Sequence, residues 1–98
     1  MDFKSNVFWT DEALVNLDNI IFYLSSNWTE KEVKIFLKKL DHAVLLIAQR
    51  PNLFPHSVYK LGARRFVLTK QVSIIYTVTN LKINILSLFD TRQDPKRM

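Results

Sequence analysis

Three apolar runs separated by short polar breaks decide the fold class, and they lie between Arg65 and Phe89 in the stretch RFVLTKQVSIIYTVTNLKINILSLF. The runs cover 65–68, 72–78 and 83–89, and they are rich in Val, Ile, Phe and Tyr, which strands favour. The breaks at 69–71 and 79–82 suit hairpin turns. The stretch therefore predicts three strands in an antiparallel meander.

Two amphipathic helices are predicted before this meander. The first begins after Thr10, whose side chain can cap it, and apolar residues recur at helical spacing as far as Ser26. The second begins with the spacing of a capping box, Thr29 to Glu32, and extends to about Gln49. The connection between them is so short that the two helices must fold back as an antiparallel hairpin.

A further short strand is expected at 6–9, because Val7 and Trp9 share one side of the chain and Phe8 the other. The predicted order is β-α-α-β-β-β, an α+β fold in which a helical hairpin packs on an antiparallel sheet. A chain of 98 residues has room for one hydrophobic core, so we expect residues 1–98 to form a single domain.

Composition excludes several classes of protein. The chain is 48% hydrophobic and 23% charged, as in a folded globular protein, and no apolar run approaches the ~18 residues of a membrane span. It has no cysteine, which excludes disulfides and thiolate metal sites and fits a reducing compartment. The first residues lack the apolar core of a signal peptide. We therefore expect a cytoplasmic protein without a metal or cofactor.

Positive charge concentrates in the second half of the chain. The net charge is +5, and from Arg50 onward nine Lys and Arg face only Asp90 and Asp94. An excess of this size can serve solubility alone, or it can attract an acidic or polyanionic partner. The clustering favours the second interpretation for the C-terminal half.

Several short motifs spread over nearly the whole chain are Trp9-Thr10, Tyr23-Leu24, Pro51, Arg64-Arg65-Phe66 and the closing Leu88-Phe89-Asp90-Thr91-Arg92-Gln93-Asp94-Pro95. Together they resemble the RelE/ParE toxin superfamily, where Phe-Asp-x-Arg-x-x-Pro is a common ending. The resemblance implies the toxin of a type II toxin–antitoxin system. It also implies a cognate antitoxin that neutralises the chain in a hetero-oligomer and links it to operator DNA.

The superfamily contains both ribosome-dependent mRNA endonucleases and inhibitors of DNA gyrase, and a few positions distinguish them. RNA cleavage needs cations at the phosphate and a group that accepts the 2′-hydroxyl proton. RelE-type nucleases carry Arg three residues before the Tyr of the third strand, but here Ser73 precedes Tyr76. The Tyr that they place after the last Arg has no counterpart after Arg92.

These differences favour the ParE-like branch and a toxin that binds its target without being an enzyme, with DNA gyrase as the target that the resemblance implies. A RelE-type mRNA interferase with a divergent active site, acting on the ribosome, is the alternative. A third possibility is a domain that has lost its potency and persists only as a partner of its antitoxin.

The candidate site residues are mainly cations of the C-terminal half. The catalytic candidates are Arg65, Tyr76 and Arg92, and the candidates for target binding are Arg65, Lys70, Arg92, Lys96 and Arg97. Arg64 and Arg65 must point to opposite faces of a strand, and Arg65 is the preferred site residue. The alternative for both arginines is that they are solvated charges on an edge strand. For Arg92, the alternative to contact with a phosphate or an acidic partner is an ion pair with Asp90.

The remaining polar and aromatic candidates are assigned to structure. His42 is expected to be exposed on the second helix, and His56 to be structural. Trp9, Trp28 and Phe54 are expected to cover the core. We also expect the antitoxin to cover apolar surface between the helical hairpin and the sheet.

Overall fold

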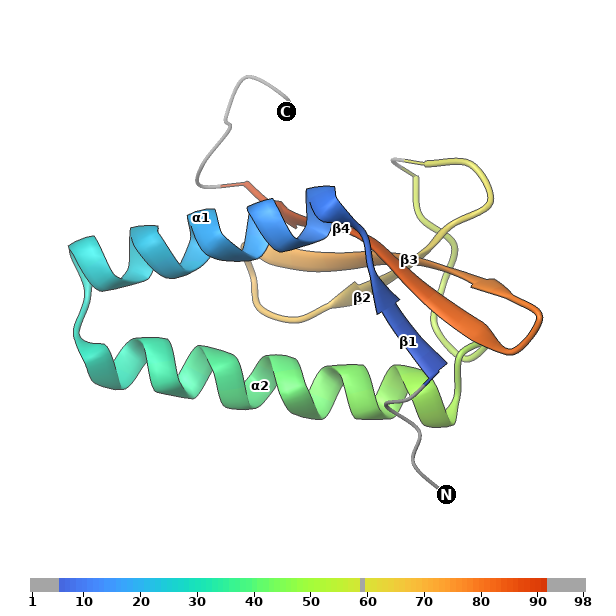
Figure 1. Cartoon of the computed structure of the whole chain (residues 1–98), viewed down its shortest axis with the longest axis horizontal. Helices are drawn as coiled ribbons and strands as arrows, with labels where there is room; N and C mark the ends of the chain where they lie inside the picture. The colour runs from blue at the N-terminus through green and yellow to red at the C-terminus, as the bar shows by residue number, and fades with distance from the viewer. Residues whose placement is uncertain (1–5, 59, 92–98) are drawn as a thin grey trace.

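A computed structural model describes residues 6–58 and 60–91, in which two helices cover one face of a four-stranded sheet (Figure 1). The elements in chain order are β1 (Val7–Trp9), α1 (Asp11–Asn27), α2 (Glu30–Gln49), β2 (Arg64–Val67), β3 (Val72–Thr79) and β4 (Lys82–Asp90). The predicted order β-α-α-β-β-β is confirmed. Within the described ranges, no helix is both long and apolar enough to cross a membrane.

The strands lie in the order β1-β4-β3-β2. The β2–β3 and β3–β4 pairs are antiparallel, which confirms the meander. The first strand differs from the expectation of a wholly antiparallel sheet, because β1 pairs in parallel with β4, with Val7 opposite Ile83. The long connection through both helices and two strands lets the chain return in the same direction. The sheet is therefore mixed, and β4 is one of its two inner strands.

The two helix starts differ in how they are capped. The Thr10 Oγ1 accepts a hydrogen bond of 3.1 Å from the Ala13 amide, as the sequence predicts. Thr29 makes no side-chain capping bond, so the predicted capping box is wrong. Its carbonyl instead accepts a 3.0 Å bond from the Glu32 amide. The side chains of Thr29 and Glu32 are both exposed, so water competes for the polar atoms that a capping box would use.

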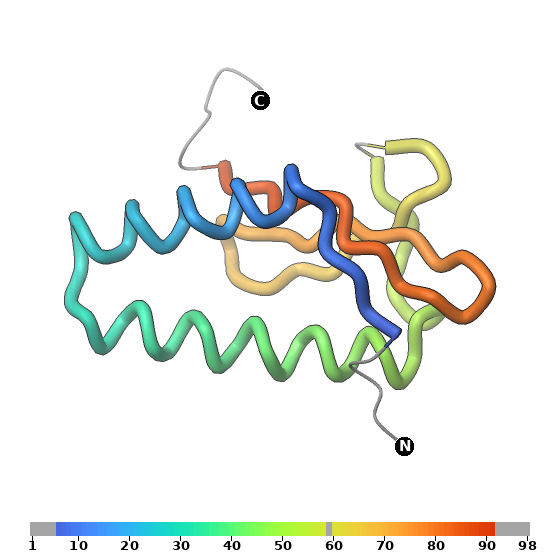
Figure 2. The backbone as a smooth tube through the Cα atoms, in the orientation of Figure 1, coloured from blue at the N-terminus to red at the C-terminus, as the bar shows by residue number. Residues whose placement is uncertain are grey.

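The hydrophobic core lies between the helical hairpin and the sheet, where Ile20 of α1 and Ile47 of α2 are buried with residues of β3 and β4. The prediction that Trp9 and Phe54 cover the core is confirmed, since both pack against it. The same prediction is wrong for Trp28, which is 58% exposed. This residue lies in the α1–α2 turn, which extends past the sheet (Figure 2), so the turn has no sheet to pack against.

A bulge in β4 is tied to α1. Ile75 lies opposite Ser87 and Tyr76 opposite Ile85, which leaves Leu86 as an extra residue. The Thr10 hydroxyl donates a 2.8 Å bond to the Leu86 carbonyl. The Asn16 side-chain oxygen accepts a 3.0 Å bond from the Leu88 amide. The N-cap residue of α1 and Asn16 within the helix thus satisfy backbone groups around the bulge and fix α1 against β4.

Candidate functional site

The sheet has a second face, turned away from the helices, which we call the outer face. Register and strand alternation place on it Phe8, Arg65, Val67, Ser73, Ile75, Thr77, Thr79, Lys82, Asn84, Ser87 and Phe89. Among these described positions there are two cations and no acidic side chain. The outer face therefore presents positive charge, and it is the first candidate for contact with a target.

Arg65 is held in place on the outer face by a residue of the neighbouring strand. Its Nε donates a 3.0 Å hydrogen bond to the Ser73 Oγ, and this serine is buried. Ser73 is the position at which RelE-type nucleases carry Arg, so the guanidinium of Arg65 reaches a site where the sequence suggested no cation. Sequence reasoning missed this pair because it depends on the register between β2 and β3.

Arg64 lies on the opposite side of β2, as the alternation predicts. In the strand register Arg64 lies opposite Tyr76 of β3. The Arg64 Nη1 donates a 2.7 Å hydrogen bond to the Phe54 carbonyl. His56, which is exposed, forms an isolated backbone bridge with Arg64. Arg64 therefore ties the 51–58 loop to the sheet. Both arginines have hydrogen-bond partners, so neither is simply a solvated edge charge.

Tyr76 is fully buried on the helix-covered face, in the hydrophobic core. Its hydroxyl donates a 2.8 Å bond to the Pro51 carbonyl. Burial raises the pKa of Tyr76 to about 12, and the opposing influence of the Arg64 charge is smaller. The raised pKa keeps the phenol protonated in the folded chain at alkaline pH values at which a solvent-exposed tyrosine ionises. The structure does not bring Tyr76 together with Arg65, since they lie on opposite faces of the sheet.

The other predicted site residues are placed as follows. Lys70 is exposed in the turn between β2 and β3, and His42 is exposed on α2, as expected for that histidine. Arg92, Lys96 and Arg97 lie outside the described residues, so their roles stay predictions. In the described part of the chain, no group of three or more His, Cys, Asp or Glu side chains could hold a metal ion.

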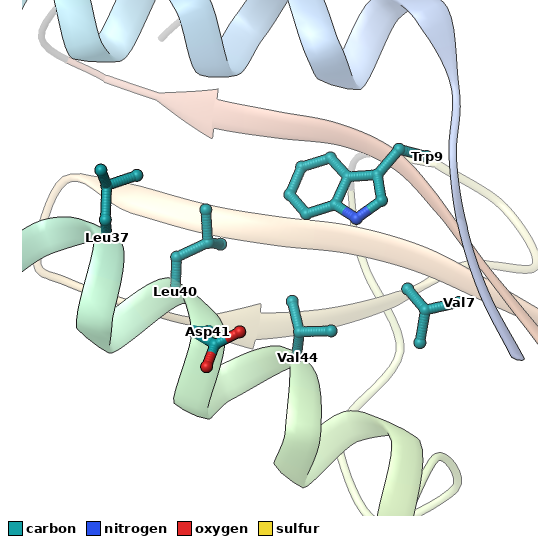
Figure 3. A pocket seen from close by; sticks show the side chains of 6 residues that line it. All are labelled: Val7, Trp9, Leu37, Leu40, Asp41 and Val44. Carbon is teal, nitrogen blue, oxygen red and sulfur yellow. The ribbon is translucent and has the colours of Figure 1, made fainter. Parts of the chain in front are cut away.

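A groove of about 300 Å³ opens between the edge strand β1 and helix α2. It is lined by Val7, Trp9, Leu37, Leu40, Asp41 and Val44. Figure 3 shows the Trp9 indole reaching from β1 towards α2, with apolar side chains of α2 facing it. Asp41 supplies the only charged side chain of this lining. Sequence analysis anticipated apolar surface between the hairpin and the sheet, but not its location beside β1.

Comparison with known families identifies this architecture. A family model described as the ParE toxin of the type II toxin–antitoxin system parDE matches residues 7–95. The chain belongs to the ParE toxin family. Membership confirms the resemblance to the RelE/ParE superfamily and its ParE-like branch, and it implies an antitoxin partner. This ParE family member is thus a toxin of the type II class.

The fold of this ParE family member also matches a solved structure. A chain of the chromosomal ParDE toxin–antitoxin system from P. aeruginosa superposes with a TM-score of 0.75 at 20% sequence identity. The match covers 91% of this chain and 98% of that chain. At this identity the likeness shows the fold alone. No curated protein sequence matches the chain.

Proposed function

We propose that this ParE family member inhibits growth by binding DNA gyrase, without cleaving RNA. The observation that carries the proposal is the separation of Tyr76 from Arg65. RNA cleavage requires a proton acceptor near the cation that stabilises the phosphate. Tyr76, the tyrosine among the catalytic candidates, is buried on the other face, and its hydroxyl donates to the Pro51 carbonyl, so it is not placed to act beside Arg65.

The charge of the outer face supports a binding role. Arg65 is oriented by Ser73, so less side-chain entropy is lost when its guanidinium contacts a carboxylate. Lys82 lies on the same face. A charge-assisted contact of this kind contributes about 1.5–3 kcal/mol. The alternative is a ribosome-dependent mRNA interferase. One observation supports it: the Arg65 side chain reaches Ser73, the position at which RelE-type nucleases carry Arg.

The groove between β1 and α2 is the proposed antitoxin site. Its apolar lining fits an apolar side chain of an antitoxin segment. Because β1 is an edge strand, its outward backbone groups are also positioned to pair with an added strand. Neutralisation would then combine side-chain burial with backbone pairing. The complex would act in the cytoplasm, where gyrase and ribosomes are found.

The test is induction of the chain in cells that lack the antitoxin, followed by two parallel assays. We expect growth to stop and plasmids to lose negative supercoils, while ribosome-bound mRNA stays intact. An Arg65→Ala strain and a His42→Ala strain serve as the site variant and the surface control. Cleavage of mRNA at defined codons with normal plasmid topology would contradict the proposal and favour the interferase.

A further inference from the structure

The turn between β3 and β4 has an unusual sequence for its geometry. It consists of Asn80 and Leu81, flanked by the paired residues Thr79 and Lys82. Both turn residues have positive φ, 48° and 67°. Two-residue hairpin turns of this kind favour Asn followed by Gly. A leucine in the left-handed region brings its Cβ close to the following carbonyl oxygen and is strained.

Leu81 gains no burial that would compensate for this strain. Its side chain is 86% exposed, so it contributes almost nothing to the core. Glycine would adopt the same φ without the steric conflict and without an apolar side chain in water. Neither the backbone nor the packing of this chain therefore explains a leucine here. Departures from local sequence preference concentrate at functional sites.

The surroundings of Leu81 form a small mixed patch, the tip patch, made of Leu81, Lys82 and Phe8. The Lys82 Nζ lies 5.5 Å from the centroid of the Phe8 ring, which is itself half exposed. This contact orients the ammonium group beside the apolar tip. The hairpin projects at the end of the molecule opposite the α1–α2 turn (Figures 1 and 2), so a partner can approach it without meeting the helices.

We infer that the tip patch is a contact surface for the protein target, in which Leu81 enters an apolar socket and Lys82 faces carboxylates at its rim. The inference rests on the proposed function, because the partner is the target whose binding stops growth. Charge supports this choice of partner, since the outer face that carries Lys82 holds one further cation, Arg65, and no acidic side chain among its described positions. An exposed leucine side chain that moves from water into an apolar pocket on a folded protein gains the free energy of burying its apolar surface.

The experiment uses two substitutions that suit a positive φ, Leu81→Gly and Leu81→Asn, together with the conservative Leu81→Met. Phe22→Ala is the matched control, because Phe22 is 73% exposed but lies in the half of α1 nearest the α1–α2 turn. We expect Leu81→Gly and Leu81→Asn to keep or raise the Tm. Both should lower growth inhibition in antitoxin-free cells by about tenfold or more, because the apolar side chain that is buried at the target is lost. Leu81→Met and Phe22→Ala should inhibit like the unchanged chain, and all variants should still be rescued by the co-expressed antitoxin.

Each contrary outcome has a distinct meaning. If the unchanged chain does not inhibit growth, the proposed function fails and the tip inference fails with it. If it inhibits but Leu81→Gly and Leu81→Asn inhibit equally, only the tip inference is wrong. A lower Tm for Leu81→Gly would make the leucine structural, and loss of antitoxin rescue alone would assign the patch to the antitoxin. Lys82→Ala is measured in the same assay, and a larger loss for it than for Leu81→Asn would overturn the apolar pocket in favour of a polyanionic partner.

Discussion

Replacing Tyr76 with Phe separates a structural tyrosine from a catalytic one. The substitution removes the hydroxyl that donates to the Pro51 carbonyl at 2.8 Å and leaves the buried ring in place. A hydrogen bond of this type contributes about 0.5–1.5 kcal/mol. Pro51 is half-buried, so water can reach part of its surface. The substitution should therefore lower the free energy of unfolding by ~1 kcal/mol. For a domain of this size that lowers Tm by about 4–8 °C.

The pH dependence of stability gives Tyr76 a second signature. Its pKa is about 12 in the folded chain, against 10.0 for a tyrosine side chain free in water, so the unfolded chain loses this proton first as the pH rises. The contribution is therefore fully present below pH 10 and is lost as the pH rises towards 12. The slope is at most about 1.4 kcal/mol per pH unit. Tyr76→Phe lacks this contribution, so its stability should fall less between those two pH values.

The assay is urea unfolding of the unchanged chain and of Tyr76→Phe, with circular dichroism as the readout. Each protein is unfolded at neutral pH and at several pH values above 10. The difference between the two proteins isolates Tyr76 from the other tyrosines and the lysines. Growth inhibition by Tyr76→Phe should match that of the unchanged chain. Equal alkaline slopes in both proteins would refute the buried, protonated phenol. Loss of growth inhibition in a stable Tyr76→Phe variant would refute the structural assignment and restore Tyr76 as a catalytic candidate.

Three further substitutions test the proposed surfaces. Arg65→Ala should lower growth inhibition about ten- to a hundredfold by removing a charge-assisted contact, and a dose–response of induced growth would measure this. Leu37→Asp should weaken antitoxin binding in titration calorimetry, because it places a charge in the groove, whereas Ile35→Asp, at nearly the same exposure on the same helix, should not. Arg92→Ala should reduce growth inhibition with the fold intact by circular dichroism, while His42→Ala should change stability by less than ~0.5 kcal/mol.

These three tests also have clear contrary results. Full inhibition by a folded Arg65→Ala chain would remove the outer face of the sheet from the target contact. Equal antitoxin affinity for Leu37→Asp and Ile35→Asp would move the antitoxin away from the β1–α2 groove. An Arg92→Ala chain that unfolds would show that Arg92 is structural, as in the alternative in which it pairs with Asp90.

The sequence predicted the order of elements because each helix and strand has its own apolar periodicity. The bounds of β3 and β4 differ by one residue or so from the predicted runs, since alternation and hairpin breaks are local signals. Periodicity carries no information about which strands become neighbours. The parallel pairing of β1 with β4 therefore went unpredicted, as did the bulge at Leu86 that Thr10 and Asn16 satisfy.

The candidate site was predictable only in part, for the same reason. Alternation correctly placed Arg64 and Arg65 on opposite faces of β2. The partners of these arginines, Phe54 and Ser73, are set by loop position and strand register. Burial of Tyr76 also depends on the two helices that cover its face, so a strand motif alone could not distinguish an exposed phenol from a buried one.

The pairing of β1 with β4 has a consequence for synthesis of the toxin. Val7 is translated 76 residues before its partner Ile83. Helix α1 also needs β4, because Thr10 and Asn16 bond to backbone groups on both sides of residue 87. The nascent chain must therefore wait with an unpaired first strand until the β4 segment has emerged. During that interval the groove beside β1 lacks its sheet, so the neutralisation that we propose at this groove would have to follow translation of β4.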